Sequence, residues 1–150
     1  MVRKSVVICV AALGLTGCST DESQPNAGSP DSGTRMPQVL VDGQPRAVSG
    51  GVTCHRAGDY ITIGIGDVSS GVGAVVTMSN PPQVRSVGLG TIDGVALGFT
   101  NSEPGQANSA AAAMRGKSYS IKGTASGSDL RNPQSPQQVS KPFEMDVTCP

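Results

Sequence analysis

The chain has 150 residues, of which 37% are hydrophobic and 15% charged, and it contains 20 glycines and 11 prolines. This content of Gly and Pro argues against a helical bundle, because both residues are unfavourable inside helices, and the low charge is not typical of disorder. Eleven basic and eleven acidic side chains give a net charge of zero, so no overall field attracts nucleic acid or an anionic membrane surface. A loop-rich β protein is expected.

Residues 1–16 have the layout of a secretory signal peptide. Arg3 and Lys4 form a basic start, and an apolar run follows over residues 6–15. A run of about ten apolar residues is too short to cross a bilayer as a stable helix, so it is typical of the apolar region of a signal peptide.

The four residues that follow the apolar core, Leu-Thr-Gly-Cys at 15–18, resemble the lipobox of bacterial lipoproteins. The resemblance implies cleavage between Gly17 and Cys18, transfer of a diacylglyceryl group to the Cys18 sulfur, and acylation of the new amino group with a chain such as palmitate. Two or three acyl chains make a stable membrane anchor. The alternative is an ordinary secretory signal with a coincidental cysteine.

Residues 19–37 are rich in Ser, Pro, Gly and Asp, and Met36 is their only large apolar residue. Such a segment cannot bury a core and is expected to be a flexible tether. The predicted organisation is therefore a lipoprotein signal peptide over 1–17, an acylated cysteine with a disordered tether over 18–37, and a folded domain over 38–150.

Short β-type runs alternate with turn signals through the predicted domain, at a spacing typical of a sandwich or barrel. The turn signals are Asp42-Gly43, Gly58-Asp59, Asn80-Pro81-Pro82 and Asp93-Gly94, the last being the strongest hairpin signal. The expected strands cover residues 39–41, 51–54, 60–65, 73–78, 83–89, 95–100, 118–125 and 143–149.

Alternation within two of these runs separates a core face from an outer face. The odd-numbered residues Ile61, Ile63 and Ile65 are apolar and alternate with more polar or smaller neighbours. The odd-numbered residues from Phe143 to Cys149 are apolar in the same way. No helices are available for parallel crossovers, so antiparallel pairing is expected. The predicted fold class is all-β, a small antiparallel β-sandwich with one disulfide.

Three features are harder to assign. Residues 107–114 read as a strand, with a short helix as the alternative. Residues 126–142 read as a long polar loop. Glu144 and Asp146 are expected on the outward, solvated face of an edge-like strand near Lys141.

Cysteine usage predicts one disulfide. Cys9 leaves with the signal peptide and Cys18 is acylated, so the exported domain keeps Cys54 and Cys149, which should pair in an oxidising compartment. The competing interpretation is a metal-binding or nucleophilic cysteine beside His55. Neighbouring residues of a strand point to opposite faces, so the adjacency of Cys54 and His55 does not build a joint site.

Catalytic and ligand-binding signals are weak. The Gly-x-Gly pairs at 64/66, 71/73 and 88/90 do not complete a nucleotide-binding fingerprint, and close backbone approach is the better explanation. A triad from His55, Asp59 or Asp67 and a serine lacks a nucleophile elbow. Tyr60 is the only aromatic residue expected outside the core, which disfavours a lectin. No enzyme activity, metal, cofactor or catalytic residue is predicted, and no ligand-binding residue is identified.

Several segments of the domain match one known family as a set. They are residues 64–66, 80–84, 86–90, 93–98, 122–127, 132–133 and 143–149. Together they resemble the LpqH family of mycobacterial nineteen-kilodalton lipoprotein antigens.

The resemblance covers about residues 39–149 and implies that the family's two paired cysteines correspond to Cys54 and Cys149. It also implies a surface antigen recognised by innate receptors and antibodies, without enzymatic activity. The Thr-rich, mannosylated cluster of the family's tether is absent here.

The predicted function is therefore a non-enzymatic display or interaction module in the cell envelope, exported and bound to the membrane through acyl chains on Cys18. The resemblance adds host innate receptors as partners, whereas nucleic acid and metal are not expected. The alternative function is a carrier that holds a lipid or small molecule in a pocket between the sheets.

Overall fold

The structure is a computed structural model that describes residues 35–101 and 109–150. Within these residues the chain forms ten strands and one short 3-10 turn, η1. In chain order the elements are β1 (Gln38–Val41), β2 (Gln44–Pro45), β3 (Val52–Ala57), β4 (Tyr60–Ile65), η1 (Val68–Ser70), β5 (Val72–Thr77), β6 (Val84–Ile92), β7 (Val95–Thr100), β8 (Ala110–Arg115), β9 (Ser118–Asp129) and β10 (Gln137–Thr148).

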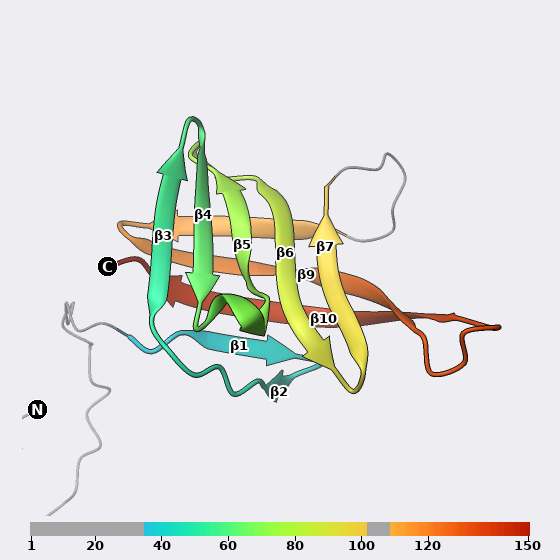
Figure 1. Cartoon of the computed structure of the whole chain (residues 1–150). Helices are drawn as coiled ribbons and strands as arrows, with labels where there is room; N and C mark the ends of the chain where they lie inside the picture. Colours follow the sequence, from blue (N-terminus) through green and yellow to red (C-terminus); the bar gives the residue numbers. More distant parts are fainter. Residues whose placement is uncertain (1–34, 102–108) are drawn as a thin grey trace, which may run out of the picture. The chain divides into compact units, whose positions relative to one another are not determined.

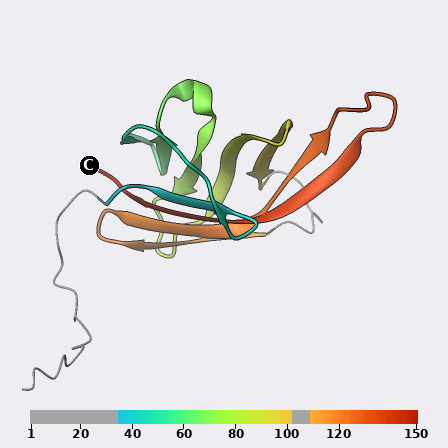
Figure 2. The ribbon, with the colours of Figure 1, turned by 90° about the horizontal axis from the view of Figure 1, so that it is seen from below.

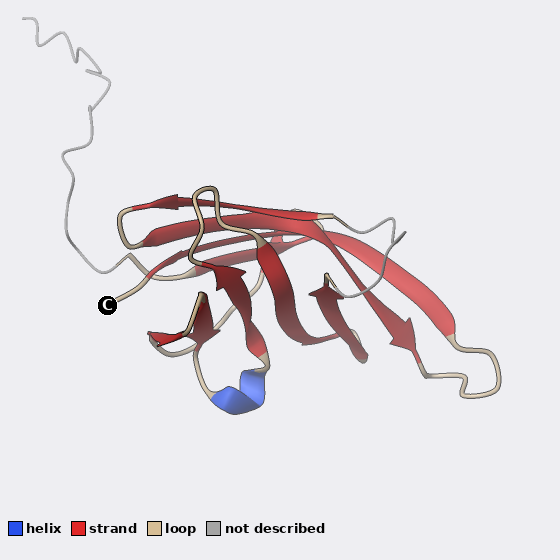
Figure 3. Cartoon of the chain, turned by 90° about the horizontal axis from the view of Figure 1, so that it is seen from above, coloured by secondary structure: helices blue, strands red, loops and turns tan. Residues whose placement is uncertain are grey.

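The strands form one antiparallel sheet that curls into two layers. Its order is β2-β1-β10-β9-β7-β6-β5-β4-β3, and β8 pairs with β9 beside this path. The sheet turns over where β7 meets β9, at the register pair Gly98 and Ser126. Figure 1 shows β3 to β7 running across β1, β10 and β9, and the turned views in Figures 2 and 3 show the two groups as separate layers. The predicted antiparallel β-sandwich is confirmed.

The core lies between the two layers, as the alternation predicts. Ile63 and Ile65 are each 1% exposed, whereas their neighbour Thr62 is exposed. On the opposite layer Phe143 and Met145 of β10 are buried. The complete buried set is Val39, Val41, Ile61, Ile63, Ile65, Val72, Ala74, Val76, Val84, Val87, Leu89, Val95, Leu97, Phe99, Tyr119, Ile121, Ala125, Phe143, Met145, Val147 and Cys149.

The two faces of β4 should respond differently to truncation. Ile63→Ala is expected to lower the free energy of unfolding by about 2–5 kcal/mol, because it removes buried methyl groups and leaves a cavity. Thr62→Ala on the outer face is the matched control and should change it by less than about 1 kcal/mol. Urea denaturation of the mature protein measures both values. Equal losses in the two variants would contradict the assignment of faces.

Two of the predicted turns close hairpins in the conformation that their residues favour. Asp93 and Gly94 have φ values of 52° and 82° between β6 and β7. Positive φ at both central residues is typical of a type I′ turn, whose twist matches that of the flanking strands. Asp42 and Gly43 adopt the same sign of φ, 55° and 73°, between β1 and β2.

The prediction of a long polar loop over residues 126–142 is wrong. β9 continues to Asp129 and β10 begins at Gln137, and these two strands stay in register from end to end. The far end of this hairpin extends beyond the other strands in Figure 1. A strand pair that has already formed gains ladder hydrogen bonds with each added residue pair, so it can grow without the apolar alternation that identifies a half-buried strand.

Two further assignments are settled by strand pairing. The strand interpretation of residues 107–114 is confirmed from Ala110 onward, where β8 pairs with β9, and residues 107 and 108 lie outside the described residues. The expectation that Glu144 and Asp146 lie on an edge-like strand is wrong, because β1 pairs with the other side of β10. Sequence periodicity indicates which face of a strand is buried but not which strands flank it.

Candidate functional site

The disulfide joins the two layers of the sandwich. Cys54 of β3 and Cys149, directly after β10, are bonded with a Cα–Cα distance of 5.7 Å across a sequence separation of 95 residues. Cys149 is 9% exposed and belongs to the core, and Cys54 packs against it. The predicted bridge is confirmed, so neither sulfur is free to bind a metal or act as a nucleophile while the bridge is intact.

His55 lies on the outer face of β3, as the parity argument predicts. It lines a surface depression of about 420 Å³ over β3 to β6, and Asp67 and Ser86 line the same depression. Within the described residues, no hydrogen bond or ion pair joins His55 to a serine or a carboxylate. The contacts of a Ser-His-Asp triad are therefore not formed there, although the three kinds of side chain share this surface.

Glycines form the floor of this same depression. The register places Gly64, Gly73, Gly88 and Gly98 side by side on β4, β5, β6 and β7. A Cβ added at Gly88 would lie 2.5 Å from the backbone oxygen of Gly71, and one added at Gly73 would strike the oxygen of Ile63. Close backbone approach explains Gly73 and Gly88, whereas the atom nearest to a Cβ at Gly64 is the Thr53 hydroxyl oxygen. The interpretation of the Gly-x-Gly pairs is therefore confirmed for Gly73 and Gly88.

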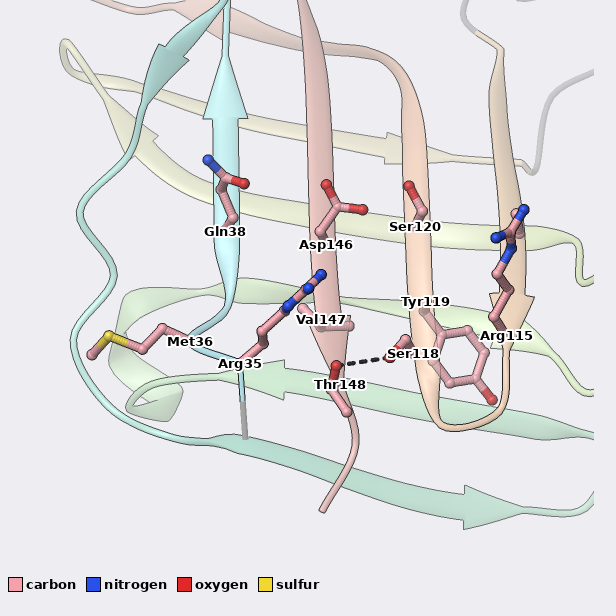
Figure 4. A pocket seen from close by; sticks show the side chains of 11 residues that line it. Arg35, Met36, Gln38, Arg115, Ser118, Tyr119, Ser120, Asp146, Val147 and Thr148 are labelled. Carbon is pink, nitrogen blue, oxygen red and sulfur yellow. Dashed lines mark hydrogen bonds between the residues drawn. The ribbon is translucent and has the colours of Figure 1, made fainter. Parts of the chain in front are cut away.

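A second depression lies where the chain enters the domain. It has a volume of about 360 Å³ and opens on the outer face of β1, β10, β9 and β8. Figure 4 shows Gln38, Asp146 and Ser120 in a row across β1, β10 and β9, in agreement with their register, and Ser118 hydrogen bonded to Thr148 at 2.8 Å. Its lining combines polar side chains with apolar surface from residues such as Met36 and Ala113, and it is open to solvent.

Charged side chains on the outer surfaces form local pairs. Lys122 Nζ lies 2.9 Å from Glu144 Oε2, and this hydrogen bond raises the pKa of Lys122 above its ordinary value. Lys141, which the sequence places near Glu144, instead pairs with Asp42 at 3.7 Å. Exposed pairs of this kind contribute little to stability.

One further pair lies on the long hairpin. Hydrogen bonds from Arg131 hold the pKa of the Asp129 carboxyl below its ordinary value. Asp129 is the last residue of β9, so this pair fixes the start of the connection to β10.

Residues 35–101 and 109–150 hold no group of three His, Cys, Asp or Glu side chains placed to bind a metal ion. No helix in these residues has the length and hydrophobicity to cross a membrane.

Comparison with known proteins decides the family. A family model described as "Mycobacterium 19 kDa lipoprotein antigen" matches residues 30–149, which is most of the chain. The chain belongs to this family. The family and its relatives are named as lipoproteins, and this name implies that they are anchored by lipid at the cell envelope.

Individual relatives support the assignment of the chain to this family. The protein named Lipoprotein LpqH of Mycobacterium avium is 52% identical over 112 residues, which cover 75% of this chain and 67% of the relative. Lipoprotein LpqH of Mycobacterium tuberculosis strain H37Rv is 42% identical, covering 97% of this chain and 96% of the relative. A putative lipoprotein of Mycobacteroides abscessus is 34% identical over 95% of this chain.

The predicted site residues fall into two groups. Cys54 and Cys149 are brought together by the fold, whereas Gly17 and Cys18 lie outside the described residues. No sequence pattern singles out Arg46, although in the structure it lines two surface depressions. Arg46 lies in the connection between β2 and β3, outside the periodic runs that sequence analysis can interpret.

Proposed function

We propose that this protein is a lipid-anchored antigen of the cell envelope whose acyl chains are carried by Cys18 after cleavage between Gly17 and Cys18. The observation that carries the proposal is the Leu-Thr-Gly-Cys sequence at 15–18, directly after an apolar run, in a chain whose residues 30–149 match a lipoprotein antigen family. A single acyl chain gives only marginal membrane binding, whereas two or three give a stable anchor.

The fold supports a role in display because of where the chain enters the domain. β1 begins at Gln38 and pairs with β10 over four residues, and the Asp42 amide donates a further hydrogen bond to the Pro142 carbonyl. Cys149, which follows β10, is bonded to β3. A force applied through residues 18–37 is thus transmitted into a covalently closed sandwich. Fully extended, those residues reach at most about 70 Å, so the domain is held near the lipid surface.

The mechanism is anchoring and presentation, without a chemical step performed by the domain. Innate receptors would bind the acylated amino terminus, and the exposed faces of the sandwich would be available to antibodies. The carrier alternative gains no support from the depressions described above, because each is lined from one layer only or from one layer and a connection. The space between the layers is occupied by the core side chains.

Intact-mass spectrometry of protein extracted from its own envelope tests this function. The mature chain is expected to begin at Cys18 and to carry the added mass of a diacylglyceryl group and an amide-linked acyl chain. Peptide fragmentation should place both modifications on Cys18. An amino terminus elsewhere, or an unmodified Cys18, would contradict the proposal, and a co-purifying lipid bound non-covalently would favour the carrier.

A further inference from the structure

Arg46 lies between two surface depressions. The smaller one, about 250 Å³, is shared with Ser49, Asp67 and Ser69. The larger one, about 470 Å³, is shared with η1 and with the β6 and β7 strands. Through its hydrogen bond to the Thr91 carbonyl, the guanidinium group joins the connection between β2 and β3 to β6.

The charge of Arg46 has no counter-charge in the described part of the chain. Its Nη1 donates a hydrogen bond to the Thr91 carbonyl oxygen at 3.2 Å, and its Nε is buried without an acceptor. Asp67 lines the smaller depression but forms no ion pair with Arg46 among the described residues. The Thr91 carbonyl replaces water at Nη1 only, and no carboxylate neutralises the charge, which favours the binding of an external anion.

The second terminal nitrogen of Arg46 is left accessible. Nη2 makes no hydrogen bond with the described residues, and unlike Nε it is not buried. Gly90, with φ of +67°, lies close to Nη2, because a Cβ at this position would lie 2.8 Å from Nη2 and would also strike the Ser70 carbonyl oxygen. The chain closes this side of the guanidinium, so a ligand would approach Nη2 from the depressions that Arg46 lines.

The lining of the larger depression indicates the kind of anion. The Ser70 hydroxyl donates to the Ile65 carbonyl, but the Ser69 hydroxyl makes no hydrogen bond among the described residues and can donate to a ligand. Ala96 is exposed on the other side, whereas the Leu97 side chain packs in the core. A guanidinium and a hydroxyl beside a small apolar side chain suit an oxyanion that carries a neutral substituent.

We propose that Arg46 and Ser69 bind the phosphoryl group of a phosphate ester, whose neutral part lies against Ala96. The ester could be the headgroup of an anionic phospholipid in the membrane that holds the anchor, or a soluble phosphate ester in the envelope. The net charge of the chain is zero, so the attraction comes from this local cation and not from the field of the whole protein.

The experiment uses the mature acylated protein, labelled with ¹⁵N, in nanodiscs of phosphatidylcholine. Glycerol 3-phosphate is titrated as the soluble probe, and a parallel sample contains nanodiscs with added phosphatidylglycerol. In the ¹H–¹⁵N NMR spectrum, saturable changes in chemical shift are expected for the amides of Ser69, Ser70, Gly90 and Thr91. Shifts with glycerol 3-phosphate alone identify a soluble ester as the source, and shifts with phosphatidylglycerol identify a lipid headgroup; either result supports the site.

Substitutions separate this site from general surface charge. Arg46→Gln should weaken binding by about ten-fold or more, because a charge-assisted hydrogen bond is lost. Arg56→Gln is the matched control, since Arg56 is exposed on β3 and lines none of the four depressions. Arg46→Lys keeps the charge but removes the planar fork, so it should bind more weakly than the native protein while remaining folded.

Three outcomes would overturn the site. They are the absence of saturable shifts with both probes in the native protein, equal weakening by Arg46→Gln and Arg56→Gln, and shifts that avoid Ser69 and Gly90. Unchanged chemical shifts for the amides of core residues, such as Ile63 and Met145, show that a variant is folded. If Arg46→Gln is not folded, Arg46→Lys decides, and binding by it as tight as that of the native protein would overturn the role of the Arg46 guanidinium in the site.

Discussion

Replacement of Cys18 by alanine is expected to abolish the membrane anchor. The Cys18 thiol is the nucleophile that would accept the diacylglyceryl group, and an alanine side chain offers no atom to form the thioether. Cleavage before position 18 should fail as well, because the peptidase of the lipoprotein pathway acts after lipid transfer. Fractionation of cells that express the variant, followed by mass measurement, should find unprocessed precursor or released protein without acyl chains.

A matched cysteine control is available in the same segment. Cys9 lies within the apolar run that the proposed cleavage removes, so Cys9→Ala should leave the anchor, the cleavage site and the mature mass unchanged. Loss of anchoring in both variants would point to a general failure of export. If the Cys18→Ala protein were still cleaved at the same bond and held by the membrane, Cys18 would not be the lipid-bearing residue.

The sequence predicts those parts of the fold that depend on neighbouring residues. The alternation of Ile61, Ile63 and Ile65 identifies a half-buried strand, and Asp93-Gly94 identifies a hairpin, because both signals lie within a few residues. The cysteine pair was also predictable, since only Cys54 and Cys149 remain after the first two cysteines are assigned to the leader and the anchor.

Pairing between distant strands could not be predicted in the same way. The sequence contains no signal that β1 lies beside β10, or that β7 meets β9 at Gly98, because these contacts depend on the path of the whole sheet. The row of glycines across β4 to β7 shows the same limit. Gly64, Gly73, Gly88 and Gly98 have no regular spacing in the chain, and only the strand register makes them neighbours.

The candidate anion site depends on such distant contacts as well. Arg46 is an ordinary residue of a polar connection until the turn at Ser69 and Ser70 and the bend of β6 at Gly90 are placed around it. Its lack of a counter-charge is a property of the folded chain. Composition records only that positive and negative charges balance overall.

Removal of the disulfide is expected to destabilise the domain strongly while leaving the anchor intact. The bridge closes a loop with a sequence separation of 95 residues. On the chain-entropy model a loop of this length stabilises the folded state by about 4–5 kcal/mol, which is a large part of the stability of an ordinary domain. The double variant Cys54→Ser with Cys149→Ser avoids a lone thiol, and chemical denaturation of the mature protein measures the loss.

The same double variant connects the fold to the proposed function. Mass spectrometry of the double variant should still find an acylated Cys18, and a receptor response that depends only on the acylated terminus should persist although the domain unfolds more readily. In the native protein, a thiol reagent should label neither Cys54 nor Cys149, because both sulfurs are bonded. Stoichiometric labelling of either cysteine in folded, exported protein would overturn the bridge and restore a redox or metal role beside His55. A receptor response lost together with the bridge would mean that recognition requires the folded sandwich and not the acyl group alone.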